Sequence, residues 1–223
     1  MSKIYYYKMT VDNGGAPAVQ DRLLSLAICK PEIRRCAQPG DWVMGFGANS
    51  FEFGGRRIAG NPLVYMARIT GRKPDGAYYS ESRYLHRPDC IYERLDGRFR
   101  LRSGARYHLD PVNLPHDVGE PPAYPKATVL LSDDFRYFAS GGTTEYRRRF
   151  PDLTEIVAGI GRGHRVAHPG TAAFERLRRQ QQSYWREAQD AVAEPDAAAP
   201  PARTGPPGGP SAAARTTRSR RKC

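Results

Sequence analysis

Cysteine is rare in this chain of 223 residues. The four cysteines are Cys29, Cys36, Cys90 and Cys223, and none lies in a C-x-x-C pair. Pairs with that spacing are typical of zinc sites, and larger cysteine sets are typical of disulfide-rich scaffolds. The sequence therefore indicates neither a disulfide framework nor a zinc site, and it favours a reducing, cytoplasmic setting.

Long hydrophobic runs are also missing. A membrane-spanning helix needs roughly 18 consecutive apolar residues, and no segment approaches that length. The first residues, 1–7, lack the apolar core of a signal peptide. We therefore expect no membrane partner.

Lysine is uncommon and arginine is abundant. Lys and Arg total 35 against 23 acidic residues, which gives a net charge of +12. An excess of this size favours a polyanionic partner such as nucleic acid. The choice of arginine over lysine is explained either by guanidinium contacts to phosphate or by the codon bias of a GC-rich genome.

Large apolar residues almost disappear near the end of the chain. Residues 193–223 are rich in Ala, Pro, Gly, Ser and Arg, which predicts a disordered basic tail. Such a tail either stays solvated or adds non-specific attraction to phosphate. Before it, Thr171 is a good N-cap for an amphipathic helix within 170–192. We therefore divide the chain into a domain at 1–169, this packed helix, and the tail.

Short strands separated by turns dominate the first 165 residues. One short helix fits between Pro31 and Ala37, where proline is tolerated in the first turn. This balance predicts an α+β domain built around a small mixed, barrel-like sheet. The expected strands are 4–10, 42–46, 63–70, 128–131 and 135–138.

The stretch from Ile28 to Asn49 carries the most information about function. It joins a basic helix to a glycine-bracketed strand, so cations, an indole and backbone N–H groups lie close together in sequence. That mixture suits the binding of a nucleotide or a base. The stretch contains no nucleophile and base pair, no metal-ligand spacing and no Walker loop, so recognition is favoured over catalysis and no cofactor is expected.

Four residues of this stretch are candidates for binding. Lys30 and Arg34 are four apart on the expected helix, so they either share a phosphate or are simply exposed charges. Trp42 either anchors the core or stacks on a base. Asp41 either fixes the turn after Gly40 or accepts a hydrogen bond from an exocyclic amine.

Four further candidates come from loops. Asn13 lies in a glycine-rich turn that would form a flexible rim, and Asn49 ends a loop whose N–H groups could approach an anion. Arg162 and His164 lie in a late glycine-rich segment. There Arg162 would supply charge, and His164 would either hydrogen-bond a base, shuttle a proton or serve the fold.

Two more clusters of side chains have alternative interpretations. A metal site at His108, Asp110, His116 and Asp117 is disfavoured because these residues lie among prolines and glycines. A run of interleaved tyrosines and arginines suits either contacts to a nucleic-acid strand or an irregular insertion with a few packed tyrosines. The tyrosines of that run are Tyr78, Tyr79, Tyr84, Tyr92 and Tyr107.

Several motifs occur together in a fixed order. They are Asn13-Gly14-Gly15-Ala16-Pro17, the segment from Leu26 to Arg34, Gly40-Asp41-Trp42-Val43, the segment from Leu131 to Phe138, and the segment from Gly159 to His164. This order resembles the second nucleotide-modification-associated domain family over roughly residues 3 to 168. The helix followed by Gly-Asp-Trp-Val also resembles, more weakly, the PUA-like superfamily with its ASCH and EVE domains.

The resemblance implies a PUA-like fold and a role with modified DNA bases, in a phage-related or defence setting. We therefore expect a protein that binds a nucleotide, a modified base or DNA in a single pocket. That pocket would be lined by the helix from Lys30 to Arg35, Trp42, the loop after Gly45 and the segment from Gly159 to His164. One alternative is an enzyme of base hypermodification that uses His164 as acid or base, assisted by Asp41 or Asp134. The other is an adaptor that binds protein partners. The base, the choice of DNA or RNA, and the oligomeric state stay open.

Overall fold

The computed structural model describes residues 2–138, 141–161 and 163–188. The candidate Arg162 and the tail expected at 193–223 lie outside the described residues. The strands are β1 (Ile4–Val11), β2 (Ala18–Gln20), β3 (Leu23–Leu26), β4 (Trp42–Phe53), β5 (Arg56–Arg57), β6 (Leu63–Arg68), β7 (Gly71–Lys73), β8 (Tyr92–Leu95), β9 (Arg98–Leu101), β10 (Val129–Ser132), β11 (Asp134–Tyr137) and β12 (His164–Ala167). The helices are α1 (Pro31–Cys36), α2 (Asn113–Asp117), α3 (Tyr146–Arg149), α4 (Pro151–Ala158) and α5 (Ala172–Glu187), with the 3₁₀ helices η1 (Ala77–Tyr79) and η2 (Ser82–Tyr84).

The central sheet has the strand order β11-β6-β4-β1-β12, and β5 pairs with the far end of β4. Strands β1 and β4 run parallel, whereas the other pairs are antiparallel. Alternation along β1 sends Ile4 and Tyr6 to one face and Tyr5 and Tyr7 to the other. Both faces are therefore buried, which is why β1 reads as a nearly continuous apolar and aromatic run.

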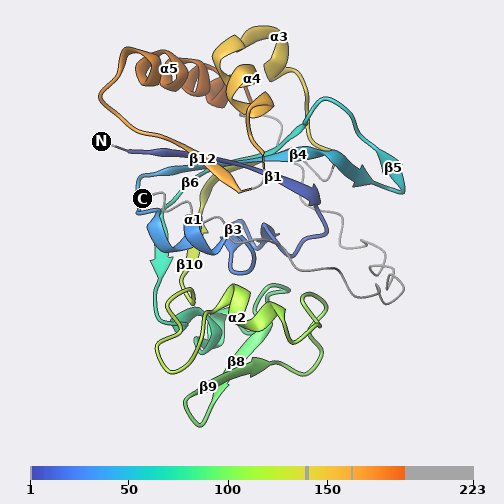
Figure 1. Ribbon diagram of the computed structural model, residues 1–223, viewed down its shortest axis with the longest axis vertical. Helices are drawn as coiled ribbons and strands as arrows, with labels where there is room; N and C mark the ends of the chain where they lie inside the picture. Colours follow the sequence, from blue (N-terminus) through green and yellow to red (C-terminus); the bar gives the residue numbers. More distant parts are fainter. Residues whose placement is uncertain (1, 139–140, 162, 189–223) are drawn as a thin grey trace, which may run out of the picture.

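Helices α3, α4 and α5 cover one face of this sheet (Figure 1). Thr171 caps α5, because its side-chain oxygen accepts a hydrogen bond from the Phe174 N–H at 3.1 Å. Phe174, Leu177 and Tyr184 are buried from the same side of α5. The helix expected after Thr171 is present, and its apolar side packs on the sheet.

Helix α1 and a second sheet lie on the other face (Figure 1). This sheet has the order β2-β3-β10-β7, and its residues share a core with Tyr5, Tyr7 and Ile33. Beyond it lies a lobe made of the β8–β9 hairpin, η1, η2 and α2 (Figure 1). Four of the interleaved tyrosines are buried in this lobe, which favours the packed-insertion interpretation; they are Tyr78, Tyr79, Tyr84 and Tyr92.

The fold confirms a mixture of helices and short strands, but the small barrel and the PUA-like arrangement are not observed. In the described residues no sheet closes on itself, because β11 and β12 form opposite edges of the central sheet. Strands β10 and β11 follow one another across Asp133 and yet enter different sheets. The turn at Ser132–Asp134, between the strands expected at 128–131 and 135–138, therefore passes the chain from one sheet to the other.

Candidate functional site

Arg34 does not share an exposed face with Lys30. Its side chain is fully buried, and its guanidinium donates hydrogen bonds of 2.6 to 2.8 Å to four backbone carbonyl oxygens. These carbonyls belong to Cys29, Lys126, Thr128 and Asp117. The expectation that Lys30 and Arg34 share one phosphate is therefore wrong, because the Arg34 side chain points into the interior. There it links α1 to distant loops through hydrogen bonds.

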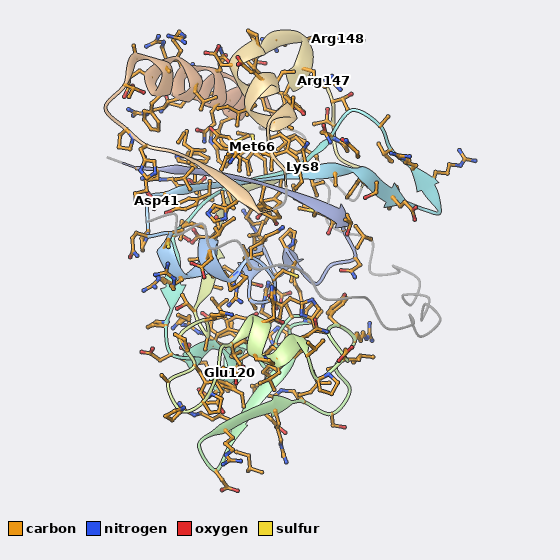
Figure 2. All side chains as sticks on the ribbon, in the orientation of Figure 1. Lys8, Asp41, Met66, Glu120, Arg147 and Arg148 are labelled. Atoms are coloured by element: carbon orange, nitrogen blue, oxygen red, sulfur yellow. The ribbon has the colours of Figure 1, made fainter. Side chains whose placement is uncertain are left out.

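Asp41 has the turn-fixing role. Its carboxylate accepts the Lys3 N–H at 2.8 Å and the Gln38 N–H at 3.0 Å, and only 7% of the residue is exposed. Figure 2 shows it at the end of the central sheet, while Lys8 lies further along. Asp41 thus joins the start of β1 to the turn before β4 and lines a cavity with its neighbours.

Trp42 is half-buried at that same end of the sheet. Its ring meets the ring of Trp185 from α5 edge to face, with centroids 4.8 Å apart. Both indoles line a cavity of about 250 Å³, which we call the tryptophan cleft. The residues of the tryptophan cleft are Ser2, Gly40, Trp42, Arg68, Asp134, Arg178, Gln182 and Trp185.

A second cavity of about 440 Å³ adjoins the tryptophan cleft, because Ser2, Gly40 and Arg68 line both. It is also lined by Lys3 and Asp41. Small-molecule sites usually occupy about 300 to 1,000 Å³, so the two cavities together have room for a base or a nucleotide. Arg136 reinforces the positive charge, since its guanidinium lies 4.1 Å from the centre of the Trp185 ring.

Lys30 and His164 lie on the opposite face of the central sheet from Trp42. His164 pairs with Tyr7 across β12 and β1, and the Lys30 ammonium lies 4.8 Å from the Tyr7 ring centre and donates to the Lys8 carbonyl. Burial lowers the pKa of His164, and the Lys30 charge lowers it further against the opposing effect of Glu32. The structure therefore brings Lys30 and His164 near each other and separates both from Trp42.

Asn13 and Asn49 are held by local contacts. The Asn13 side-chain oxygen accepts the Gly15 N–H, and its carbonyl accepts the Tyr107 hydroxyl at 2.8 Å. Asn49 is exposed on β4, and its side-chain oxygen accepts a hydrogen bond from Asn61. Neither residue lines the tryptophan cleft, so the single pocket expected from sequence is divided among several places.

One constellation was missed at the sequence level. The Cys29 Sγ lies 3.3 Å from His108 Nε2, and His108 Nδ1 is hydrogen-bonded to an Asp117 carboxylate oxygen. Asp117 is fully buried, and its other oxygen accepts the Cys29 N–H at 2.9 Å. The stretch that lacks a nucleophile and base pair in sequence thus contributes a thiol, while the imidazole arrives 79 residues later.

This constellation is a relay and not a set of converging metal ligands. The two ring nitrogens of His108 point in opposite directions, one to sulfur and one to carboxylate. No group of three such side chains suited to a metal ion occurs in the part of the chain that the structure describes. The hydrogen bonds to Asp117 and to Cys29 raise the pKa of His108 to about 10, against the opposing effect of burial.

The raised pKa of His108 predicts a pH dependence of stability. The pKa of His108 in the folded protein lies above its ordinary value of 6.5. Its contribution to folding stability is therefore complete below pH 6.5 and is lost as the pH rises toward 10. We expect the free energy of unfolding to fall by about 2 kcal/mol over that window, a figure reduced for solvent screening. Urea denaturation between pH 6 and 9.5 measures it. If the unfolding free energy of a His108→Asn variant fell with pH as steeply as that of the wild-type protein, the assignment of this pH dependence to His108 would be contradicted.

Fold and cavities define a basic, mixed α/β protein with an open cleft between a sheet end and a helix. Within the described residues, no helix has the length and apolar character required to cross a membrane. The model of the nucleotide modification associated domain 2 family matches residues 1–197, and the chain belongs to that family. The resemblance seen in the ordered motifs is thereby confirmed. No curated protein and no solved structure matches the chain.

Proposed function

We propose that this protein binds a nucleotide or a nucleic-acid base, most simply within DNA, in the tryptophan cleft and thereby serves base modification or its recognition. The observation that carries the proposal is the meeting of Trp42 and Trp185 with exposed arginines around one cavity. Membership in a nucleotide-modification family supports the class of ligand. The cytoplasmic, phage-related or defence setting belongs to the same proposal.

Stacking would supply part of the affinity. Trp42 and Trp185 are both half-buried, so each ring is anchored by the core and still borders the cavity. A base stacked on an aromatic side chain gains about 1 to 3 kcal/mol, and this gain depends little on the identity of the base. The cleft therefore suits a planar heterocycle.

Arginine pairing with phosphate would supply the rest. Arg68 and Arg178 border the cleft, and their side chains are about half exposed, at 55% and 46%. Their ion pairs within the protein are long, at 3.9 Å to Asp134 and 3.7 Å to Glu175. Exposed pairs of this length are weak, so either guanidinium can turn toward a phosphate at little cost.

Binding of a fluorescently labelled single-stranded DNA, followed by anisotropy at several salt concentrations, tests the proposal. We expect Arg68→Ala and Arg178→Ala each to weaken binding by roughly tenfold and to reduce the salt slope by about one ion. Arg98→Ala is the matched control, because Arg98 is an exposed arginine on β9 in the distant lobe. Equal losses in all three variants would indicate non-specific attraction and contradict the cleft.

The two alternatives predict different results. Turnover of a nucleotide that is lost in His164→Ala while binding persists would favour an enzyme, and His164 lies on the far face of the sheet from the cleft. A partner protein that remains bound after nuclease treatment would favour an adaptor. Competition by mononucleotides for the cleft would favour the binding function over both.

A further inference from the structure

We propose that Cys29, His108 and Asp117 form a nucleophilic thiol site that accepts an acyl group from an ester, thioester or amide. The order of the groups is that of a covalent catalyst: a thiol, an imidazole within 3.3 Å of it, and a carboxylate on the other ring nitrogen. Cys29 would be the nucleophile and His108 the acid and base. Asp117 would be a positioning residue, because it contacts the ring and not the substrate.

The backbone around Cys29 provides a second and independent observation. Cys29 lies in the turn between β3 and α1 with φ at 59°, and Lys30 follows with φ at 42°. Two successive non-glycine residues in the left-handed region are strained, and such strain is concentrated at functional sites. A sharp turn from strand to helix also presents the nucleophile of many hydrolases.

Two buried groups hold this turn from both sides. The Asp117 carboxylate accepts the Cys29 N–H, and the Arg34 guanidinium donates to the Cys29 carbonyl at 2.7 Å. Both residues are fully buried, so the position of the thiol is fixed by groups with little freedom of their own. The burial of Arg34, which removes it from a phosphate site, thus serves the geometry of Cys29.

Exposure differs between the carboxylate and the other two groups of the relay. Asp117 is 0% exposed, the His108 side chain is 22% exposed, and Cys29 is half-buried. The carboxylate is therefore kept from water, whereas Cys29 and His108 are each only partly buried. Cys90 is a useful contrast, since it is 3% exposed and burial raises the pKa of its thiol to about 11.

The reaction balances without any further reagent than water. The Cys29 sulfur, as thiolate, attacks the carbonyl carbon and forms an S–C bond; the bond to the leaving group then breaks, and protonated His108 gives that group its proton. Water next attacks the thioester, His108 takes a proton from it, and the S–C bond breaks. The products are a carboxylic acid and an alcohol, thiol or amine, and the thiol site is restored.

The charges that face this site must be included in any pH profile. Burial acts to raise the pKa of Asp117, but the hydrogen bond and charge of His108, the Cys29 N–H and the Arg34 charge together lower it below its ordinary value. The further titratable groups in contact with the relay or close to it are Tyr7, Lys30, Tyr92 and His116.

Full-length protein treated with p-nitrophenyl acetate tests the proposal. We expect a burst of about one p-nitrophenolate per chain, with the acetyl group found on Cys29 by peptide mass spectrometry. Cys29→Ala should abolish the burst, and His108→Asn should slow it by roughly a hundredfold. Asparagine tolerates the left-handed backbone at position 108, where φ is 50°. Cys90→Ala is the matched control and should react like the wild-type protein.

A second measurement needs no variant and so does not depend on one folding. Near pH 6.5, iodoacetamide should alkylate Cys29 at least about tenfold faster than it alkylates N-acetylcysteine, because the Cys29 sulfur is held 3.3 Å from the His108 Nε2. Acetylation spread over several residues, or a folded His108→Asn variant with the wild-type burst rate, would overturn the proposal. Alkylation of Cys29 no faster than the free thiol would also overturn it.

Discussion

An Arg34→Met variant is expected to unfold with a free energy about 3 to 5 kcal/mol below that of the wild-type protein. Among the described residues Arg34 is the largest fully buried side chain, and its guanidinium donates to four carbonyl oxygens. Methionine fills much of the volume but donates no hydrogen bond, so these acceptors would stay buried without partners. Chemical denaturation followed by circular dichroism measures the loss.

The neighbouring residue provides a matched control. Arg35 lies on the same helix, is exposed, and pairs with Glu32 at 2.9 Å. An exposed pair of this kind contributes about 1 kcal/mol at most, so Arg35→Met should lose far less stability than Arg34→Met. If the two variants lost similar amounts of unfolding free energy, the substitutions would be acting on helix α1 as a whole and not through the buried guanidinium.

An Arg87→Met variant is expected to lose a similar amount, about 3 to 5 kcal/mol at neutral pH. Arg87 and Asp89 are an ion pair at 3.8 Å in which both side chains are almost fully buried. Removal of the arginine leaves a buried carboxylate without its counter-charge. It also removes the five hydrogen bonds that Arg87 donates to the carbonyls of Ala18, Gln20 and Leu23 and to the hydroxyls of Ser25 and Tyr78.

The ionisation of Asp89 gives this prediction a distinctive pH dependence. Burial raises the pKa of Asp89 even with Arg87 beside it, so its charge already costs stability as pH rises above the ordinary carboxyl range. Without Arg87 the cost grows, and the deficit of Arg87→Met should therefore shrink as pH falls from 7 to 5. Adding Asp89→Asn should recover part of the loss, whereas a deficit independent of pH and of Asp89 would contradict the ion-pair explanation.

Local patterns along the chain predicted much of the secondary structure. The expected strands at 4–10 and 63–70 correspond to β1 and β6, and the helix expected from Pro31 ends within one residue of the observed α1. These elements follow from apolar alternation and capping, which depend on neighbours in sequence. The pairing of strands joins segments that are far apart in the sequence. The local pattern therefore did not predict the parallel pairing of β1 with β4 or the open central sheet.

Site residues were harder to predict because their roles are set by distant partners. The sequence pattern predicts that a basic side chain on a six-residue helix is exposed. Arg34 is buried because the distant loops at Asp117 and Lys126 lie against it. The thiol of Cys29 and its imidazole are 79 residues apart. One signal is present in the sequence: His108 and Asp117 lie nine residues apart, although the sequence suggested for them only a metal site, which it disfavoured.

The tryptophan cleft contains one residue that was a candidate for binding, Trp42, and one that was not, Trp185. Trp42 was expected either in the core or beside a base, and it packs on the core while it lines the cavity. Trp185 lies in the amphipathic helix expected within 170–192, and nothing in its spacing places it beside Trp42. The partners predicted for Trp42, Lys30 and His164, lie instead on the other face of the sheet.

Tryptophan fluorescence tests the central claim most directly, because the only two tryptophans of the chain both line the cleft. In a Trp185→Phe variant all indole emission comes from Trp42, and the matched Trp42→Phe variant reports on Trp185 alone. Titration with mononucleotides at low salt should quench both variants saturably, with the same apparent affinity, and Arg68→Ala should weaken that affinity. Binding of nucleotide detected by calorimetry without any change in either indole would contradict the cleft as the binding site.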